Sequence, residues 1–158
     1  MDLAAAVTSF HAGAIGAAGE ELRLPDWRVQ DWKQLFEFTS IRSVMPGDAL
    51  IRSGEPDQTL YFVLHGKLEV IVRSNDGMSM GRVALVGAGS VLGELAFFDG
   101  GPRSAGAWAV DTCEVAAMSP EQYAAFEGAN PALAHELLFA LGRLLAIRLR
   151  KTNARVVG

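Results

Sequence analysis

The sequence has little cysteine and histidine, and it has no long uninterrupted apolar run. Its single cysteine, Cys113, cannot form an intrachain disulfide, so we expect a small buried thiol in a reducing, cytoplasmic compartment. The three histidines, His11, His65 and His135, lie far apart and in no ligand-like cluster, so the sequence predicts no metal site. No stretch is apolar enough for a transmembrane helix, and Asp2 stands where a signal peptide carries Lys or Arg. We therefore expect neither a membrane span nor an export signal.

Strong positive charge is also absent. The 158 residues include 14 Lys and Arg against 18 Asp and Glu, which gives a net charge of −4. This balance argues against general attraction to nucleic acid or to an anionic membrane. Cations do gather in the last part of the chain, and we interpret them as partners of the negative end of a helix dipole: Arg143, Arg148, Arg150, Lys151 and Arg155.

The pattern of apolar residues divides the chain into three parts. Residues 1–24 are rich in Ala and Gly, and they predict an arm that is weakly helical or disordered. Residues 25–128 begin with a short amphipathic helix over 25–36 and continue as short strands separated by Gly, Pro, Asn and Asp. Residues 129–158 form one long helix, which starts at Asn130-Pro131 and extends to about Asn153.

The strand region predicts an α+β, mainly β fold. Its turn signals recur at the spacing of an antiparallel β-barrel or jelly roll of about eight strands, flanked by N-terminal helices and the long C-terminal helix. The clearest hairpin joins residues 60–64 to 68–72 through His65-Gly66-Lys67, because both segments are dense in β-branched and aromatic residues.

The long helix has more apolar residues than one solvated face accommodates, so it must pack on the barrel, on a partner, or on both. Leu137, Leu141 and Leu144 follow a 4-3 spacing that predicts a homodimer contact, while Leu138 and Leu145 can face the barrel.

Residues 92–105 hold the groups with the clearest chemistry. Gly93 enters a short helical turn, whose free backbone amides favour an anion, and Arg103 can donate to phosphate oxygens. Glu94 has the wrong charge for phosphate, yet it can accept a hydrogen bond from a sugar hydroxyl. This set suits a ligand with a phosphate and a ribose. The alternative is a surface ion pair between Glu94 and Arg103.

Two motifs resemble the cyclic nucleotide-binding domain family. Gly93-Glu94-Leu95-Ala96 and Arg103-Ser104-Ala105 match the family's phosphate cassette in order and spacing, and Gly54-Glu55-Pro56 precedes a matching strand. The sequence departs from the family at Asp57, where a small residue is usual, and at Phe97, where an aliphatic one is usual.

The resemblance implies a sensor that binds cyclic AMP, with cyclic GMP as the less favoured ligand, and it implies no catalytic cofactor. It assigns ribose and phosphate to the cassette, while valines offer apolar walls. In the similar bacterial catabolite activators, a Thr-Ser pair at the end of the long helix contacts adenine, and Thr152 and Asn153 occupy that place here. The expected ligand-binding residues are Leu92, Gly93, Glu94, Leu95, Ala96, Arg103, Ser104, Ala105, Val70, Val72, Val83, Thr152 and Asn153.

The resemblance also implies that ligand binding moves the long helix and signals to an unidentified effector protein. Only residues 154–158 follow that helix, so we expect no direct DNA binding. No nucleophile and base are suitably spaced, so we expect no enzyme. Two alternatives stay open: a ligand-free dimeric interaction module with the same fold, and a cupin-type enzyme that the few histidines disfavour.

Overall fold

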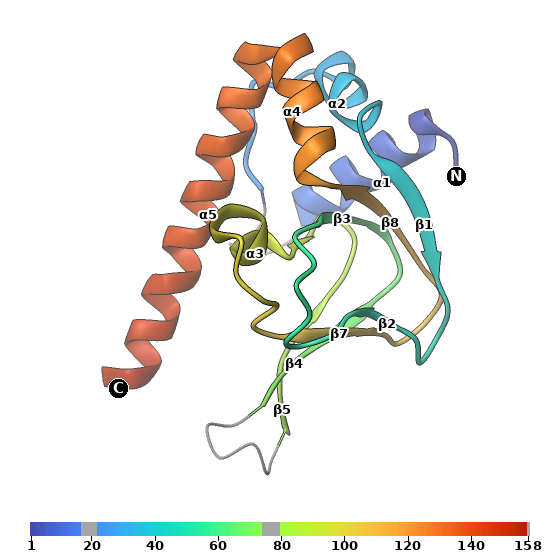
Figure 1. Cartoon of the computed structure of the whole chain (residues 1–158). Helices are drawn as coiled ribbons and strands as arrows, with labels where there is room; N and C mark the ends of the chain where they lie inside the picture. Colours follow the sequence, from blue (N-terminus) through green and yellow to red (C-terminus); the bar gives the residue numbers. More distant parts are fainter. Residues whose placement is uncertain (17–21, 74–79, 158) are drawn as a thin grey trace.

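The computed structural model describes residues 1–16, 22–73 and 80–157. Helices gather at one end of the molecule and strands at the other, and α5 runs along one side of both (Figure 1). The helices are α1 (Leu3–Gly16), α2 (Val29–Phe36), α3 (Glu94–Asp99), α4 (Pro120–Ala129) and α5 (Pro131–Val157). The strands are β1 (Ser40–Val44), β2 (Ala49–Ile51), β3 (Leu60–His65), β4 (Leu68–Arg73), β5 (Met80–Val86), β6 (Val91–Leu92), β7 (Gly106–Ala109) and β8 (Cys113–Met118).

The described strands form two four-stranded antiparallel sheets. The first sheet has the order β1-β8-β3-β6, and the second has the order β2-β7-β4-β5. The pairings β4 with β5, β3 with β6, β2 with β7 and β1 with β8 alternate between the sheets, as in a double-sheet jelly roll. The predicted mixed fold with eight antiparallel strands is confirmed for the described residues, where the strands form two packed sheets.

The predicted hairpin between residues 60–64 and 68–72 is wrong. These residues lie in β3 and β4, which belong to different sheets: β3 pairs with β6 and β8, and β4 pairs with β5 and β7. The chain crosses between sheets at Gly66, whose φ of +86° favours glycine. The apolar residues of two neighbouring strands predict that both strands are buried, but they do not determine with which other strands each one pairs.

Strand β3 lies at the centre because it is apolar on both faces. Leu60, Phe62 and Leu64 pack toward the helices, while Tyr61 and Val63 pack in the separate core between the sheets. All five are buried. The alternation of a strand therefore places one sheet between two hydrophobic cores.

The N-terminal arm contributes to the helix-side core. The sequence favoured a weakly helical or disordered arm for residues 1–24; the structure has helix α1, with Phe10 fully buried. The Phe10 ring contacts the rings of Trp32, Phe36 and Phe62. The Ala-rich and Gly-rich composition predicted less helical order than the structure has, because the packing of a few large side chains outweighs weak helix propensity.

Helix α5 turns its leucine stripe inward. Leu137, Leu141 and Leu144 are fully buried in the chain's own core, so the predicted dimer face is wrong. Among the side chains of α5 that the structure describes, the large apolar ones that are exposed are Phe139 and Leu149. Spacing predicts that leucines share a face, but it does not say which surface covers that face.

Candidate functional site

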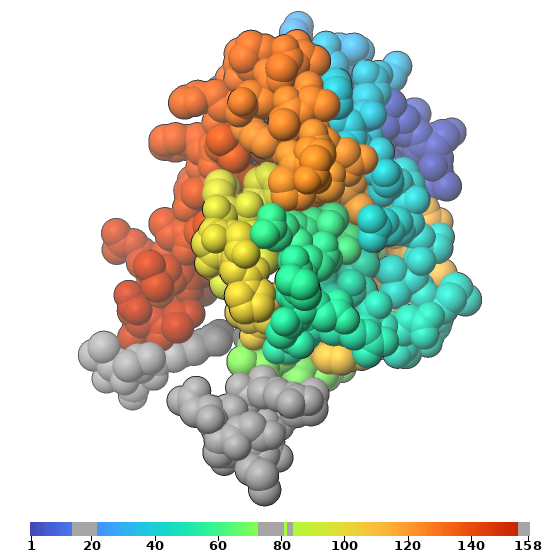
Figure 2. Space-filling view, viewed as in Figure 1, coloured from blue at the N-terminus to red at the C-terminus, as the bar shows by residue number. Residues whose placement is uncertain are grey.

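A cavity of about 290 Å³ lies where the second sheet, α3 and α5 meet. In the space-filling view, the red part of α5 lies beside the yellow segment that holds α3, and the surface is recessed between them (Figure 2). The cavity is lined by Ile51, Val70, Val72, Ala84, Val86, Leu92, Gly93, Glu94, Leu95, Ala96, Arg103, Ser104, Ala105, Gly106, Ala107, Arg148, Lys151 and Thr152.

The cavity brings together most residues that the sequence singled out. All eight predicted residues between 92 and 105 line it, and so do Val70, Val72 and Thr152. The Thr152 hydroxyl donates to the Arg148 carbonyl oxygen at 3.0 Å, as is common on a helix. Asn153 is exposed and does not line the cavity, and the side chain of Val83 lies outside the described residues.

Gly93 shapes the start of α3 beside the cavity. Its φ is +83°, and a Cβ at this position would lie 2.5 Å from Nη1 of Arg103 and 2.7 Å from the Thr59 carbonyl oxygen. Only glycine therefore fits both the backbone conformation and the space. The sequence interpretation of Gly93 as the entry to a short helical turn agrees with this geometry.

The guanidinium of Arg103 is buried at the cavity wall and largely held by the protein. Its Nη1 donates to the Gly93 carbonyl oxygen at 3.0 Å, and its Nη2 donates to the Thr59 carbonyl oxygen at 2.6 Å and to Oδ2 of Asp57 at 2.9 Å. The Nε atom is buried and has no hydrogen-bond partner among the described residues. A buried cationic donor without an acceptor is costly, so it marks a place where an anion would be stabilised.

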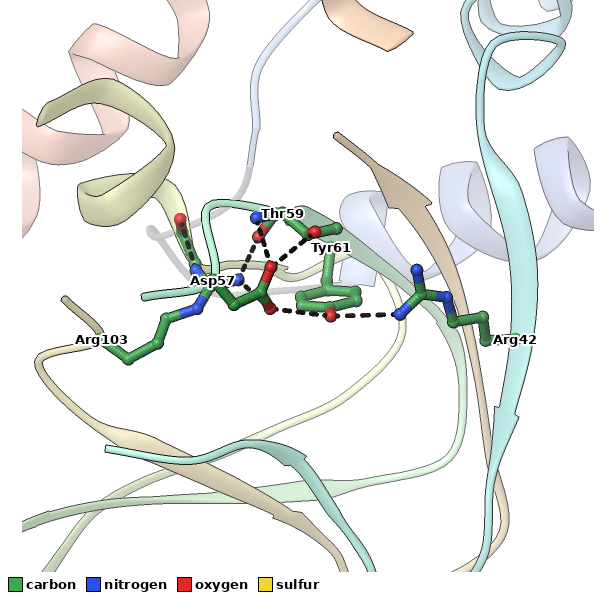
Figure 3. Close-up of polar contacts among 6 residues, drawn as sticks. Arg42, Asp57, Thr59, Tyr61 and Arg103 are labelled. Atoms are coloured by element: carbon green, nitrogen blue, oxygen red, sulfur yellow. Dashed lines mark hydrogen bonds and ion pairs between the residues drawn. The ribbon is translucent and has the colours of Figure 1, made fainter. Parts of the chain in front are cut away.

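Asp57 lies between Arg103 and Tyr61, with Arg42 on the far side of the Tyr61 ring (Figure 3). The Tyr61 hydroxyl donates to Asp57 at 3.3 Å and accepts from Arg42 at 3.5 Å. Burial alone would raise the pKa of Asp57, but hydrogen bonds from Arg103 and Thr59 outweigh burial and lower that pKa below its ordinary value of 3.8. Asp57 is therefore ionised at neutral pH.

The carboxylate of Glu94 is paired with α5. Arg148 donates from Nη1 to Oε1 of Glu94 at 2.5 Å, and from Nη2 to the Val91 carbonyl oxygen at 3.1 Å. Arg148 therefore connects the C-terminal half of α5 to both β6 and α3. Among the described residues, Oε2 of Glu94 has no hydrogen-bond donor, so this second oxygen of the carboxylate can accept from a ligand.

Sequence reasoning missed several residues of the cavity wall. Arg148 and Lys151 were assigned only to the helix dipole, although Arg148 precedes Thr152 by four residues and so shares its helix face. That spacing was a usable signal. Among the missed sheet residues, Gly106 and Ala107 directly follow Ala105 of the cassette, so their position was a usable signal. Ile51, Ala84 and Val86 have no local signal, because the strand order brings them to the cavity.

Residues 41–127 match the family described as "Cyclic nucleotide-binding domain". The match covers both motifs of the sequence analysis and more than half of the chain. The chain belongs to the cyclic nucleotide-binding domain family. The cavity lies next to the cassette of this cyclic nucleotide-binding domain, and Arg148 reaches it from outside the matched range.

Curated relatives of this cyclic nucleotide-binding domain include transcriptional regulators. The chain is 38% identical over 108 residues to the "cAMP-activated global transcriptional regulator" of Haemophilus influenzae, covering 68% of this chain and 46% of that protein. It is 36% identical over 107 residues to the "Cyclic AMP receptor protein" of Thermus thermophilus, with 68% and 47% covered. The chain thus spans about half the length of these relatives.

Solved structures show the same fold. The Catabolite Activator Protein of Thermus thermophilus matches with a TM-score of 0.74 and 30% identity, over 84% of this chain and 60% of that chain. A cyclic nucleotide-binding domain from Methylobacillus flagellatus matches with a TM-score of 0.80 and 24% identity, over 96% and 84%. The second likeness supports the fold alone.

The described residues also bear on a metal site and on a membrane span. In the described ranges, no three His, Cys, Asp or Glu side chains gather as metal ligands would. No described helix combines the length and the apolar character needed to cross a bilayer. The expected absence of a metal stays a prediction.

Proposed function

We propose that this chain reversibly binds cyclic AMP in the cavity and acts as a regulatory sensor without transforming its ligand. The observation that supports this best is Arg103, a buried cation at the cavity wall whose Nε has no acceptor among the described residues. A cyclic phosphate would supply both the missing acceptor and an opposite charge. Membership of the family supports the same ligand class.

The two charged residues of the cassette bind different parts of the ligand. Arg103 faces the phosphate, while Glu94 accepts a hydrogen bond from a ribose hydroxyl through its second oxygen. Val70 and Val72 line the apolar wall of the second sheet, and Thr152 lines the cavity from α5. We place the base between these valines and α5, since the base is the least polar and least charged part of such a ligand.

Cyclic AMP is proposed over cyclic GMP on two grounds. The Thr152 hydroxyl donates its proton to the Arg148 carbonyl, so it is left to accept, which suits the 6-amino group of adenine and not the 6-oxo group of guanine. Relatives from Haemophilus influenzae and Thermus thermophilus carry cyclic AMP in their names. Asn153 does not line the cavity, so we propose no contact between Asn153 and a base bound in the cavity of the same protomer. Calorimetric titration with each nucleotide tests the order: equal affinity, or tighter binding of cyclic GMP, would contradict it.

The output that we propose is a change in the C-terminal half of α5. Up to residue 154, the last fully buried residue of this helix is Leu144, and none of the side chains of residues 145–154 is buried. Arg148 joins this half to the cassette through Glu94 and Val91. A ligand that rearranges the Arg148–Glu94 pair can therefore change the preferred conformation of this half of α5 without disrupting the core. A partner protein would bind one of these conformations better than the other. Hydrogen exchange over residues 145–154 should change when cyclic AMP is added.

We further propose a homodimer, now through the outer face of α5. Phe139 and Leu149 are 74% and 61% exposed, and Gly142 and Ala146 lie between them on the same face. Large side chains flanking small ones at a 3-4-3 spacing allow a second copy of the same stripe to interdigitate. Phe139→Glu should convert a dimer to a monomer in light scattering at micromolar concentration, whereas Val29→Glu, on α2, should not. A monomeric parent would contradict the dimer.

One observation favours the ligand-free interaction module as a second candidate. Both cassette charges already have protein partners, since Asp57 pairs with Arg103 and Arg148 pairs with Glu94. Calorimetric titration separates the two candidates: saturable binding of a cyclic nucleotide supports the sensor, and no binding of either nucleotide supports the interaction module. A cytoplasmic location and the absence of direct DNA binding and of enzymatic activity remain predictions.

A further inference from the structure

Asp57 is the carboxylate that the described structure pairs with the cavity arginine. Its Oδ2 lies 2.9 Å from Nη2 of Arg103, whose side chain is 3% exposed. Asp57 itself is 38% exposed, so it balances a buried charge from a partly solvated position. It is also the residue at which the sequence departs from the small side chain usual in the family.

Groups other than Asp57 also orient Arg103. Two backbone carbonyls, of Thr59 and Gly93, accept hydrogen bonds from the same guanidinium, and its Cζ lies 5.7 Å from the centre of the Tyr61 ring. These contacts involve main chain and a fully packed ring, so they persist when the side chain at position 57 changes. Asp57 adds one further hydrogen bond and, unlike the other partners, a negative charge.

We propose that Asp57 is a resident counter-ion of Arg103 that lowers the affinity of the cavity for an anionic ligand. The proposal rests on the proposed function, because the ligand's cyclic phosphate is the anion in question. Arg103 and Asp57 together are neutral, so an incoming phosphate meets a cation whose charge is already balanced. The phosphate and the carboxylate then repel each other across the guanidinium.

Neighbouring groups keep this carboxylate charged and in place. The Thr59 amide and hydroxyl donate to Oδ1 of Asp57 at 3.1 and 2.8 Å. Tyr61 donates to Oδ2, and Arg42 lies beyond the ring with its Cζ 5.9 Å from the ring centre. Asp57 therefore sits between two arginines and stays ionised, which is the state that a counter-ion requires.

The test removes the charge while keeping the shape. Asp57→Asn retains one oxygen, which can still accept from Thr59, while the bond from Arg103 to the other oxygen is lost. The carbonyls of Thr59 and Gly93 still accept from the guanidinium and hold it in place. Asp48→Asn is the matched control: it changes the net charge equally at an exposed turn residue that does not line the cavity. Cyclic AMP is titrated calorimetrically into the parent and both variants at low and at moderate NaCl, after thermal melts confirm folding.

We expect Asp57→Asn to bind cyclic AMP roughly three- to ten-fold more tightly than the parent. The affinity of Asp48→Asn should stay within about two-fold of the parent's affinity. The gain should shrink as NaCl increases, because its origin is electrostatic. Asp57→Ala, which removes the acceptor as well, should also bind more tightly.

The outcomes separate this proposal from the proposed function. Unchanged or weaker binding by Asp57→Asn in a parent that binds cyclic AMP overturns the counter-ion and leaves the sensor intact. Binding that is measurable only in Asp57→Asn supports both proposals. Failure of the parent and of both Asp57 variants to bind cyclic AMP or cyclic GMP overturns both.

Discussion

Two ion pairs border the cavity, and they join different parts of the fold. Arg103 and Asp57 belong to segments next to the sheets, between α3 and β7 and between β2 and β3, and the arginine is the buried partner. Arg148 and Glu94 connect α5 to α3, and here the carboxylate is the more buried partner, at 11% against 25% exposure.

The difference indicates separate roles for the two pairs. The first pair places a cation within the rigid scaffold, where backbone carbonyls also hold it. The second connects the site to a helix half with no buried side chain after Leu144 among those described. We therefore expect changes to the first pair to act on ligand affinity, and changes to the second to act on α5 as well.

The largest expected effect is on binding at the first pair. Arg103→Ala removes the buried cation, so we expect the affinity for cyclic AMP to fall by about 100-fold or more. Arg52→Ala is the matched control, because Arg52 is an exposed arginine that does not line the cavity. Calorimetric titration measures both. Equal binding by Arg103→Ala and the parent would refute the assignment of Arg103 to the phosphate.

A smaller loss is expected for the carboxylate of the second pair. Glu94→Gln keeps an acceptor for the ribose hydroxyl but loses its charge, so affinity should fall by about ten-fold. The parent should lose a similar factor when cyclic AMP is replaced by 2′-deoxy cyclic AMP. If the parent binds both nucleotides equally, Glu94 does not contact the ribose.

For the arginine of the second pair, the expected effect is on the stability of the fold. Arg148→Ala breaks the contacts to Glu94 and Val91, which should lower the free energy of unfolding by about 1–2 kcal/mol. Urea unfolding checks this, with the exposed Arg150→Ala as control. An unchanged midpoint would show that the pair does not hold α5.

Truncation after Arg150 removes Thr152 while leaving both ion pairs in place. It should reduce the preference for cyclic AMP over cyclic GMP. We expect that preference to be about 1–3 kcal/mol in the parent, because it rests on one or two hydrogen bonds at a partly solvated site. Competition titration of the two nucleotides measures the ratio. The same ratio before and after truncation would remove α5 from base recognition.

The smallest expected effect is on the stability of the fold at low pH. The pKa of Asp57 is lowered in the folded state, so its charge stabilises the fold above the ordinary value of 3.8, and this contribution is lost as the pH falls through the folded-state pKa. The parent should therefore lose slightly more stability than Asp57→Asn below about pH 4. Thermal melts from pH 6 to pH 3 test the difference, and parallel curves would contradict it.

Sequence reasoning located the cassette but not the partners of its charges. Gly93, Glu94 and Arg103 lie within eleven residues of one another, so one local pattern contains all three. Asp57 is 46 residues from Arg103, and Arg148 is 54 residues from Glu94. No local pattern encodes such distances, so neither pair could be predicted.

Local interactions account for what the sequence by itself determined: the mainly β region between helices, the start of α5 at Pro131 and the turn at Gly93. These depend on backbone conformation and on the spacing of apolar residues along a short segment. Tertiary structure alone decided that β3 and β4 enter different sheets, that Leu141 faces inward, and that each cassette charge has a partner. The physical reason is that these outcomes depend on which distant surfaces meet, and the same apolar stripe or charge fits more than one of them.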